Sequence, residues 1–272
     1  GISLLLSHMI TVPLFKLMNG LQKIKEGDLD IRVYVQSGDE IQLLTESFNQ
    51  MADGLKEREM IKDAFSRYAS DQVVQKILQG EVKPVLEGSL RDVTVLFADI
   101  RKFTQITNNL SPQQVVQVLN QYFSAMNDIV NKYEGLVDKY TGDEIMAVFG
   151  APLSHSDDPH RAVKTSIDMI GALEDVNDKL DKLHLPTISI GIGIHSGTAI
   201  AGNIGSEKRL NYTVIGKDVN IAARIVDLAK ENEIYISDAC YQKVKNHIQV
   251  GQLEQVSLKG LQETFNVFRI VI

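Results

Sequence analysis

The sequence predicts an α/β (α+β) fold with a mixed sheet, preceded by a helical coiled-coil region. From about residue 90 onward, short apolar, β-branched runs alternate with amphipathic stretches of helical length. Before that point, apolar residues recur in steps of three and four, the heptad spacing of helices that pack on other helices. The 272 residues are 44% hydrophobic and 23% charged, which is a globular composition with room for more than one domain.

The first predicted helix covers residues 10–27 and ends at Gly27, a residue suited to a helix C-terminus. Its heptad positions are Ile10, Leu14, Leu17, Leu21 and Ile24. An extended connector follows, in which Ile31, Val33 and Val35 form one apolar face. A second helix begins near Asp39 and repeats the seam at Ile41, Leu44, Phe48, Met51 and Leu55. Such helices cannot bury their seams alone, so we expect a parallel dimer that forms a four-helix bundle, with a plain amphipathic hairpin as the alternative.

Pro13, the connector and the Asp39–Glu40 pair resemble a HAMP signal-relay domain, which we assign to residues 10–59. The resemblance implies a place just inside a membrane, between a sensor and an output domain. Residues 1–9 are apolar but too short to span a bilayer. We interpret them as the remnant of a transmembrane helix in a longer, membrane-anchored chain. The alternative is a plain helix start that is buried in a dimer.

Residues 60–89 are predicted to couple the two regions, with a helical stretch over 56–80 and a loop over 81–89 that contains Pro84 and Gly88. The output domain is assigned to residues 90–272. Its predicted strands are 92–98, 135–140, 144–149, 187–195, 198–203, 209–215, 233–237 and 265–271. Its predicted helices are 111–132, 159–184, 216–231 and 238–246. Ser111 before Pro112, and Asp157 and Asp158 before Pro159, predict capped helix starts.

Charge and cysteine content exclude some classes of function. The net charge of −7 argues against a nucleic-acid partner, because phosphate binding needs a basic surface. A single cysteine, Cys240, rules out an internal disulfide and indicates a reducing compartment.

Two aspartates stand at the ends of apolar runs. Asp99 follows "VTVLFA", where a buried carboxylate needs a partner such as a metal ion or Arg101. Asp143 lies in the hairpin turn "TGDE", where turn chemistry alone could explain it. After Asp99, the turn "IRKFT", which contains Phe103 and Thr104, and a helix after it offer backbone amides that can hold phosphate oxygens. Two carboxylates beside a phosphate cradle are typical of Mg²⁺ sites in nucleotide enzymes.

The segments "FADIRKFT", "YTGDE" and "YTVIGKDVNIAARI", in this order, resemble the catalytic domain of class III nucleotidyl cyclases over roughly residues 90–272. The resemblance implies a ferredoxin-like domain that converts ATP or GTP to the cyclic 3′,5′-monophosphate and pyrophosphate. It also implies two Mg²⁺ per site, with Mn²⁺ possible. The implied roles are metal binding by Asp99, Asp143 and the carbonyl of Ile100, ribose orientation by Asn220, transition-state stabilisation by Arg224 and outer-phosphate contact by Lys259.

Base choice depends on Lys139 and Thr213. Adenine presents an acceptor ring nitrogen and a donor amino group, and a lysine can only donate while a threonine hydroxyl can accept. The pair therefore favours adenine. Guanylate cyclases of the family typically carry glutamate where Lys139 stands. Many adenylate cyclases carry aspartate where Thr213 stands, and the lysine–threonine pair resembles a bacterial subgroup.

A dimer is expected for the output domain as well. Lys139 and Asp143, four residues apart on an extended strand, would lie roughly 13 Å from each other, too far to serve one compact site. In the family, one subunit supplies the metal aspartates and the other supplies the base, ribose and transition-state residues. The resemblance therefore implies a homodimer with two shared active sites.

Two further motifs are interpreted as structural. "HSDDPHRA" (155–162) has metal-ligand residue types but is explained by a capped helix start, and His195 in "GIGIHSG" lies in a strand-turn-strand pattern. The sequence thus predicts an adenylate cyclase behind a HAMP relay, cytoplasmic itself and tied to the cell membrane in the full-length protein. Alternatives are a guanylate cyclase, a nucleotide-binding regulatory module without turnover, and a diguanylate cyclase. The turn "TGDEI" in place of "GGDEF" disfavours the last of these.

Overall fold

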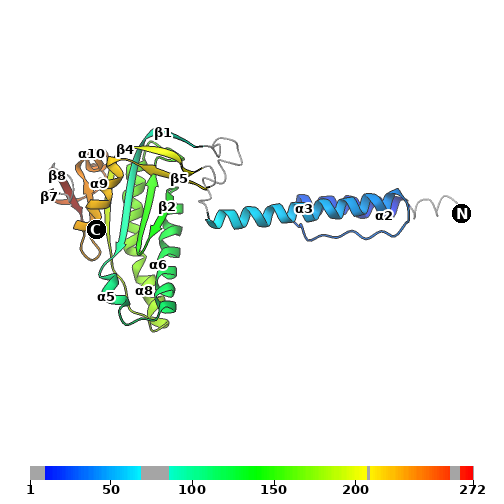
Figure 1. Cartoon of the computed structure of the whole chain (residues 1–272), viewed down its shortest axis with the longest axis horizontal. Helices are drawn as coiled ribbons and strands as arrows, with labels where there is room; N and C mark the ends of the chain where they lie inside the picture. Colours follow the sequence, from blue (N-terminus) through cyan, green and yellow to red (C-terminus); the bar gives the residue numbers. More distant parts are fainter. Residues whose placement is uncertain (1–9, 69–85, 207–208, 258–263, 272) are drawn as a thin grey trace. The chain divides into compact units, whose positions relative to one another are not determined.

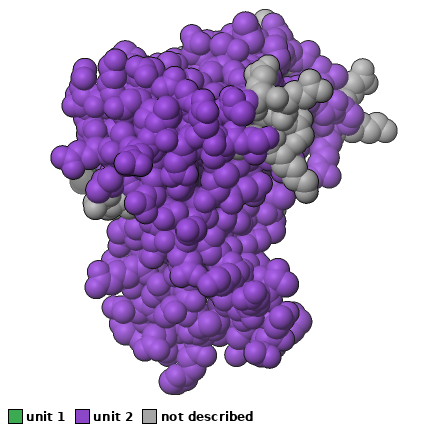
Figure 2. Space-filling model, turned by 90° about the vertical axis from the view of Figure 1, so that its left-hand side faces the viewer, with its two compact units in different colours: residues 1–71 green, residues 72–272 purple. Residues whose placement is uncertain are grey.

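The structure, a computed structural model, describes residues 10–68, 86–206, 209–257 and 264–271. The chain divides into two compact units, residues 1–71 and 72–272, shown as a ribbon in Figure 1. Figure 2 shows one face of the second unit in space-filling form.

The first unit contains helices α2 (Val12–Lys25) and α3 (Glu40–Tyr68), joined by a connector without regular secondary structure. Gly27, at φ +94°, follows α2 and confirms the predicted helix end. The apolar face of the connector is confirmed too, because Ile31, Val33 and Val35 pack with Leu17 and Phe48. The side chain of Asn49 holds the connector in place, accepting from the Val33 amide at 3.0 Å and donating to its carbonyl at 2.8 Å.

Only part of each heptad seam is covered within one chain. Leu17 and Phe48 are buried, whereas Leu14, Leu21 and Leu44 are exposed. Gly20 allows the connector and α3 to approach closely, because a Cβ there would lie 2.8 Å from both Phe48 and Val33. Neither helix is long and apolar enough to cross a membrane, and this holds for every helix among the described residues.

The second unit is built on an eight-stranded mixed sheet of order β2-β3-β1-β4-β6-β8-β7, with β5 pairing β4. Its strands are β1 (Glu87–Ile100), β2 (Leu136–Thr141), β3 (Glu144–Phe149), β4 (Ile190–Ser206), β5 (Arg209–Ile215), β6 (Ile234–Ser237), β7 (Val250–Ser257) and β8 (Thr264–Ile270). The β4–β6 pair is parallel and the other pairs are antiparallel. The mixed α/β class predicted from the sequence is confirmed.

Helices cover both faces of the sheet. They are α5 (Phe103–Thr107), α6 (Pro112–Lys132), α7 (Asp158–Gly171), α8 (Leu173–Lys182), α9 (Lys217–Ile225) with the 3₁₀ turn η2 (Val226–Leu228), and α10 (Asp238–Val244). The alternation of β1 separates two cores. Leu96 and Ala98 pack with α6, α7, α8 and α10, whereas Val95 and Phe97 pack with α9 on the opposite face.

Three predicted boundaries are wrong. The predicted strands 187–195 and 198–203 form one strand, β4, because β1 pairs with it in unbroken register from Ile190 to Asn203. Gly197 is therefore no turn residue; a Cβ there would lie 2.1 Å from the Asp218 carboxylate. β1 begins at Glu87, inside the predicted loop 81–89, and the predicted helix 159–184 is interrupted at Ala172.

Other differences concern single elements. β7 was not predicted, and the helix expected over 216–231 ends at Ile225 with one 3₁₀ turn after it. The Ser111 cap is confirmed as a capping box with Gln114. The Asp157 cap is wrong, because the side chain of Asp157 bonds Arg161 instead of a helix-start amide.

Candidate active site

Asp99 and Asp143 lie at the same end of the strand pair formed by β1 and β3. Asp99 is opposite Glu144 in the β1–β3 ladder, and Asp143 directly precedes Glu144 in the β2–β3 turn. Gly142, at φ +67°, makes that turn, so the predicted hairpin is present. The Asp143 carboxylate is close enough to Asp99 to raise the pKa of the Asp99 carboxyl group.

The surroundings of Asp99 are short of positive charge. Burial raises the pKa of Asp99 to about 6; the Arg101 guanidinium lowers this pKa, and the Asp143 carboxylate raises it further. Burial also raises the pKa of Glu144 to about 7, with further contributions from the carboxylates of Asp99 and Asp227. Several carboxylates therefore share one guanidinium, an arrangement that a bound divalent cation would stabilise.

Among the described residues, Arg101 forms an ion pair with Asp99. The sequence analysis named Arg101 and a metal ion as the two candidate partners of this carboxylate. Its Nε bonds the Asp99 carbonyl at 3.2 Å, and its Nη1 bonds the carbonyls of Val226 at 3.4 Å and Ala229 at 3.2 Å. Arg101 thus ties the end of β1 to the turn that follows α9.

The strand–turn–helix order predicted after Asp99 is present. β1 ends at Ile100, and α5 begins at Phe103 after Lys102, which adopts a left-handed conformation at φ 57°. Phe103 packs against the core and Thr104 is exposed. Ile100 is 1% exposed as a whole residue, so its backbone carbonyl is nearly closed to solvent along with its side chain.

Lys139 and Thr213 come together around a residue that the sequence analysis did not single out, Asp138. Oδ2 of Asp138 accepts the Thr213 hydroxyl at 2.9 Å and lies 3.1 Å from Nζ of Lys139. The side chain of Asp138 is fully buried and that of Lys139 is 49% exposed. Asp138 was missed because side chains of adjacent residues on a regular strand point to opposite faces.

Asn220 and Arg224 share the exposed face of α9, as their spacing predicts, while Val219, Ala222 and Ile225 bury the other face. Arg224 approaches Asp227 at 3.8 Å, a pair open to solvent. No hydrogen bond or ion pair among the described residues links Asn220 or Arg224 to Asp99 or Asp143. Lys259 lies outside the described residues.

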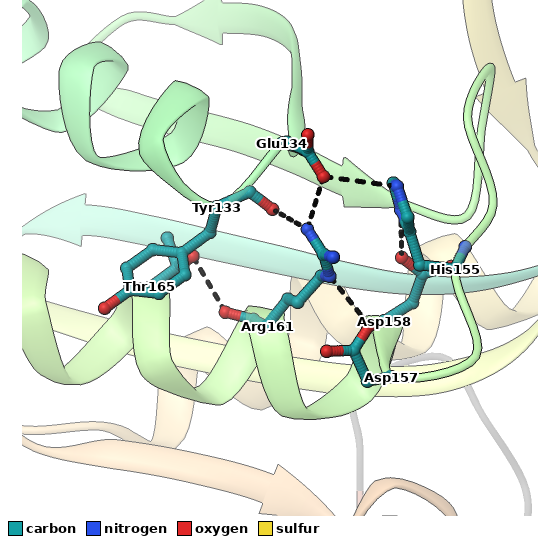
Figure 3. Close-up of polar contacts among 7 residues, drawn as sticks. All are labelled: Tyr133, Glu134, His155, Asp157, Asp158, Arg161 and Thr165. Carbon is teal, nitrogen blue, oxygen red and sulfur yellow. Dashed lines mark hydrogen bonds and ion pairs between the residues drawn. The ribbon is translucent and has the colours of Figure 1, made fainter.

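The histidine-containing motif at 155–162 forms a polar network in place of a metal site (Figure 3). Nε2 of His155 lies 3.2 Å from Glu134, and its Nδ1 lies 3.4 Å from Asp158. Arg161 joins Glu134 to Asp157, at 2.6 Å and 2.7 Å. In the described part of the chain, no group of three or more His, Cys, Asp or Glu side chains is placed to hold a metal ion.

His195 is buried within β4, and its surroundings are structural. Its Nδ1 lies 2.8 Å from the Ser237 hydroxyl and its Nε2 lies 3.5 Å from Asp218. Burial lowers the pKa of His195, with Asp218 acting in the opposite direction. Ser237 is 3% exposed and also caps α10, and His195 is 6% exposed, so the imidazole and this hydroxyl are closed to a substrate.

Comparison with known proteins gives two family matches. The family described as adenylate and guanylate cyclase catalytic domain matches residues 85–271, and the HAMP domain family matches residues 5–57. Two uncharacterized proteins of Mycobacterium tuberculosis are similar: Rv1320c is 37% identical over 83% of this chain and 38% of its own length. Rv1319c is 33% identical over 95% of this chain and 47% of its own length. The chain thus spans less than half the length of these relatives.

Solved cyclase structures share the fold of the second unit. The guanylyl cyclase Cya2 matches with a TM-score of 0.66 and 37% identity, covering 68% of this chain and 94% of that one. The adenylyl cyclase CyaB from P. aeruginosa matches with a TM-score of 0.66 and 31% identity, covering 69% and 97%. A catalytic-domain match over most of the chain, together with this fold, means that the chain belongs to the class III adenylate/guanylate cyclase family and carries a HAMP domain before its catalytic domain.

Proposed function

We propose that the chain is an adenylate cyclase that converts ATP to 3′,5′-cyclic AMP and pyrophosphate. The observation that carries this choice is the cluster in which Lys139 and Thr213 meet around Asp138. Lysine as a donor and a hydroxyl as an acceptor complement the ring nitrogen and amino group of adenine. The similarity to CyaB of P. aeruginosa, an adenylyl cyclase, supports the same choice.

The acidic residues at this end of the β1–β3 strand pair are suited to binding Mg²⁺. Asp99 and Glu144 are partly desolvated, and the carboxylates of Asp99, Asp143 and Glu144 carry an excess of negative charge that one Arg101 does not balance. Asp99 and Asp143 would hold the metal ions, together with the backbone carbonyl of Ile100; two Mg²⁺ per site are expected, and Mn²⁺ is a second candidate. Bound Mg²⁺ would act as a Lewis acid that lowers the pKa of the ribose 3′-hydroxyl and offsets the phosphate charge.

The side chains on α9 act on the reacting groups. The 3′-oxygen attacks the α-phosphorus, the new O–P bond forms as the bond to pyrophosphate breaks, and the 3′-hydroxyl proton is released. Arg224 offsets the charge that develops on the α-phosphate, and Asn220 orients the ribose. Phe103, Thr104 and Lys259 belong to the part of the site that holds the triphosphate.

Each site is shared between two copies of the chain. Within one chain no described bond joins the α9 residues to the metal aspartates, and Arg224 is 48% exposed, open to a partner. A homodimer then has two equivalent sites under two-fold symmetry. Mixing inactive Asp99→Ala and Arg224→Ala chains should restore about a quarter of wild-type activity, because half of the dimers gain one intact site. A mixture that stays inactive, although heterodimers form, would contradict the shared site.

The HAMP domain sets how the two catalytic copies meet. The exposed seam residues of α2 and α3 would be covered by the partner, and α3 continues without interruption beyond the predicted HAMP boundary at residue 59. In the full-length protein we place this portion in the cytoplasm, next to the cell membrane. Insertions that shift the heptads near residue 60 should change cyclic AMP production; unchanged activity would contradict the coupling.

The direct test is incubation of the purified chain with Mg²⁺ and either ATP or GTP, with both cyclic nucleotides measured. Cyclic AMP should be the main product, and Asp143→Ala should abolish it. Guanylate cyclase activity is the second candidate, because Cya2, a guanylyl cyclase, is 37% identical to this chain. Predominant cyclic GMP would establish that function instead.

A further inference from the structure

Asp138 is the extra residue of an irregularity in β2. Val137 is opposite Ala147 and Lys139 is opposite Met146 in the β2–β3 ladder, so Asp138 has no counterpart on β3. A bulge of this kind re-aims a side chain and is common beside active sites. Here it lets two sequence neighbours, Asp138 and Lys139, place their charged groups 3.1 Å apart.

The carboxyl group of Asp138 also reaches another strand. Oδ2 accepts the hydroxyl proton of Thr213, which lies on β5, a strand that pairs with β4 and not with β2. Oδ1 is buried and has no hydrogen-bond partner in the described part of the chain. A buried carboxylate with an unmade bond costs stability, and a residue that weakens the fold in this way is typical of functional sites.

The bond to Asp138 determines what Thr213 can offer to a ligand. A hydroxyl has one proton and two lone pairs, whereas a carboxylate only accepts. Once the Thr213 proton is donated to Oδ2, only lone pairs of its oxygen remain for a base. An acceptor at this place favours the donor amino group of adenine and repels O6 of guanine, which is itself an acceptor.

We propose that Asp138 is a positioning residue that determines base specificity: it holds the Thr213 hydroxyl as an acceptor and the Lys139 ammonium beside it, so that the site prefers adenine. Asp138 acts through these two side chains and does not touch the nucleotide. The inference rests on the proposed adenylate cyclase function, and it assigns the preference for ATP to a third residue behind the lysine–threonine pair.

The decisive variant is Asp138→Asn, which keeps the shape but can donate to Thr213 through Nδ2. The Thr213 proton is then released toward the base, where it suits O6 of guanine. The ratio of kcat/KM for ATP to that for GTP should fall by about tenfold, because the oxygen that accepts from the amino group of adenine then presents a proton to it. Asp138→Ala, which leaves the hydroxyl free to rotate, should give an intermediate ratio.

Two controls separate positioning from a structural role. Asp168 accepts a lysine and a hydroxyl in the same manner, from Lys132 at 2.7 Å and from Tyr133 at 2.9 Å, but it lies on α7. Asp168→Asn should leave the ATP-to-GTP ratio unchanged. In a Thr213→Val background, Asp138→Asn should change the ratio less than in wild type, because one of the two groups through which Asp138 acts is gone.

The outcomes distinguish a failure of this inference from a failure of the proposed adenylate cyclase function on which it rests. If wild type prefers ATP and Asp138→Asn lowers turnover of both nucleotides equally, the inference fails while the adenylate cyclase function stands. If wild type turns over neither nucleotide, or prefers GTP, the proposed function fails and the inference with it. Should Asp138→Asn not fold, the ratio in Asp138→Ala and the competition of ATP with GTP for binding decide the same question.

Discussion

Asp99 and Asp138 are both carboxylates on strands of one sheet, and their surroundings give them opposite tasks. Asp99 is surrounded by further acids, and burial raises its pKa to about 6. Asp138 is surrounded by donors, a lysine ammonium and a threonine hydroxyl. The first site lacks positive charge and is suited to a cation, whereas the second uses its charge to orient neutral and cationic neighbours. Residue type alone therefore does not determine what a buried aspartate does.

The largest expected effect separates these two aspartates. Asp99→Ala should abolish cyclic AMP formation, because it removes one of the two carboxylates proposed to hold Mg²⁺. Asp138→Ala should retain measurable turnover, because Asp138 acts only on neighbouring side chains. Initial rates with ATP and Mg²⁺ measure both. Equal loss of activity in the two variants would break the distinction drawn between them.

The next effect concerns pH. In the metal-free protein the pKa of Asp99 is raised from 3.8 to about 6. The stability that the protonated Asp99 carboxyl group contributes to the fold is therefore lost as the pH rises between these two values. Protons and Mg²⁺ compete for the same oxygens, so Mg²⁺ affinity should fall by up to about tenfold per pH unit below about pH 6. Titration of nucleotide-free protein with Mg²⁺, followed by thermal stability from about pH 5 to about pH 8, measures this. An affinity that does not vary over that range would contradict the assignment of Asp99.

The smallest expected effect concerns Ser111, whose side-chain oxygen stabilises a helix and has no role in the proposed site. Ser111 caps α6 by accepting from the Gln114 amide at 3.3 Å. Ser111→Ala should lower the free energy of unfolding by about 1 kcal/mol and leave the ATP-to-GTP ratio unchanged. Thermal unfolding and the two-nucleotide assay measure the two quantities. A changed ratio would mean that base preference responds to general stability, which would weaken the role given to Asp138.

Local patterns predicted much of the fold. Short apolar runs identified β1, β2 and β3, and the Ser111–Pro112 pair located the start of α6. They failed where a distant strand decides the outcome. Ser196 and Gly197 suggest a turn, but β1 is long enough to pair with them, and β4 continues as one strand. β7 has only a weak pattern of its own and forms on β8.

The same division applies to the candidate site. The sequence by itself determined that Asp99 ends a buried strand, that Asp143 lies in a hairpin turn, and that Asn220 and Arg224 share a helix face, because each is a matter of short-range periodicity. Only the tertiary structure brought Asp138 to Thr213, which is 75 residues away in the chain. A strand irregularity re-aims one side chain, and a second strand arrives opposite it. Neither event leaves a mark in the local sequence, because both are decided by how the sheet packs as a whole.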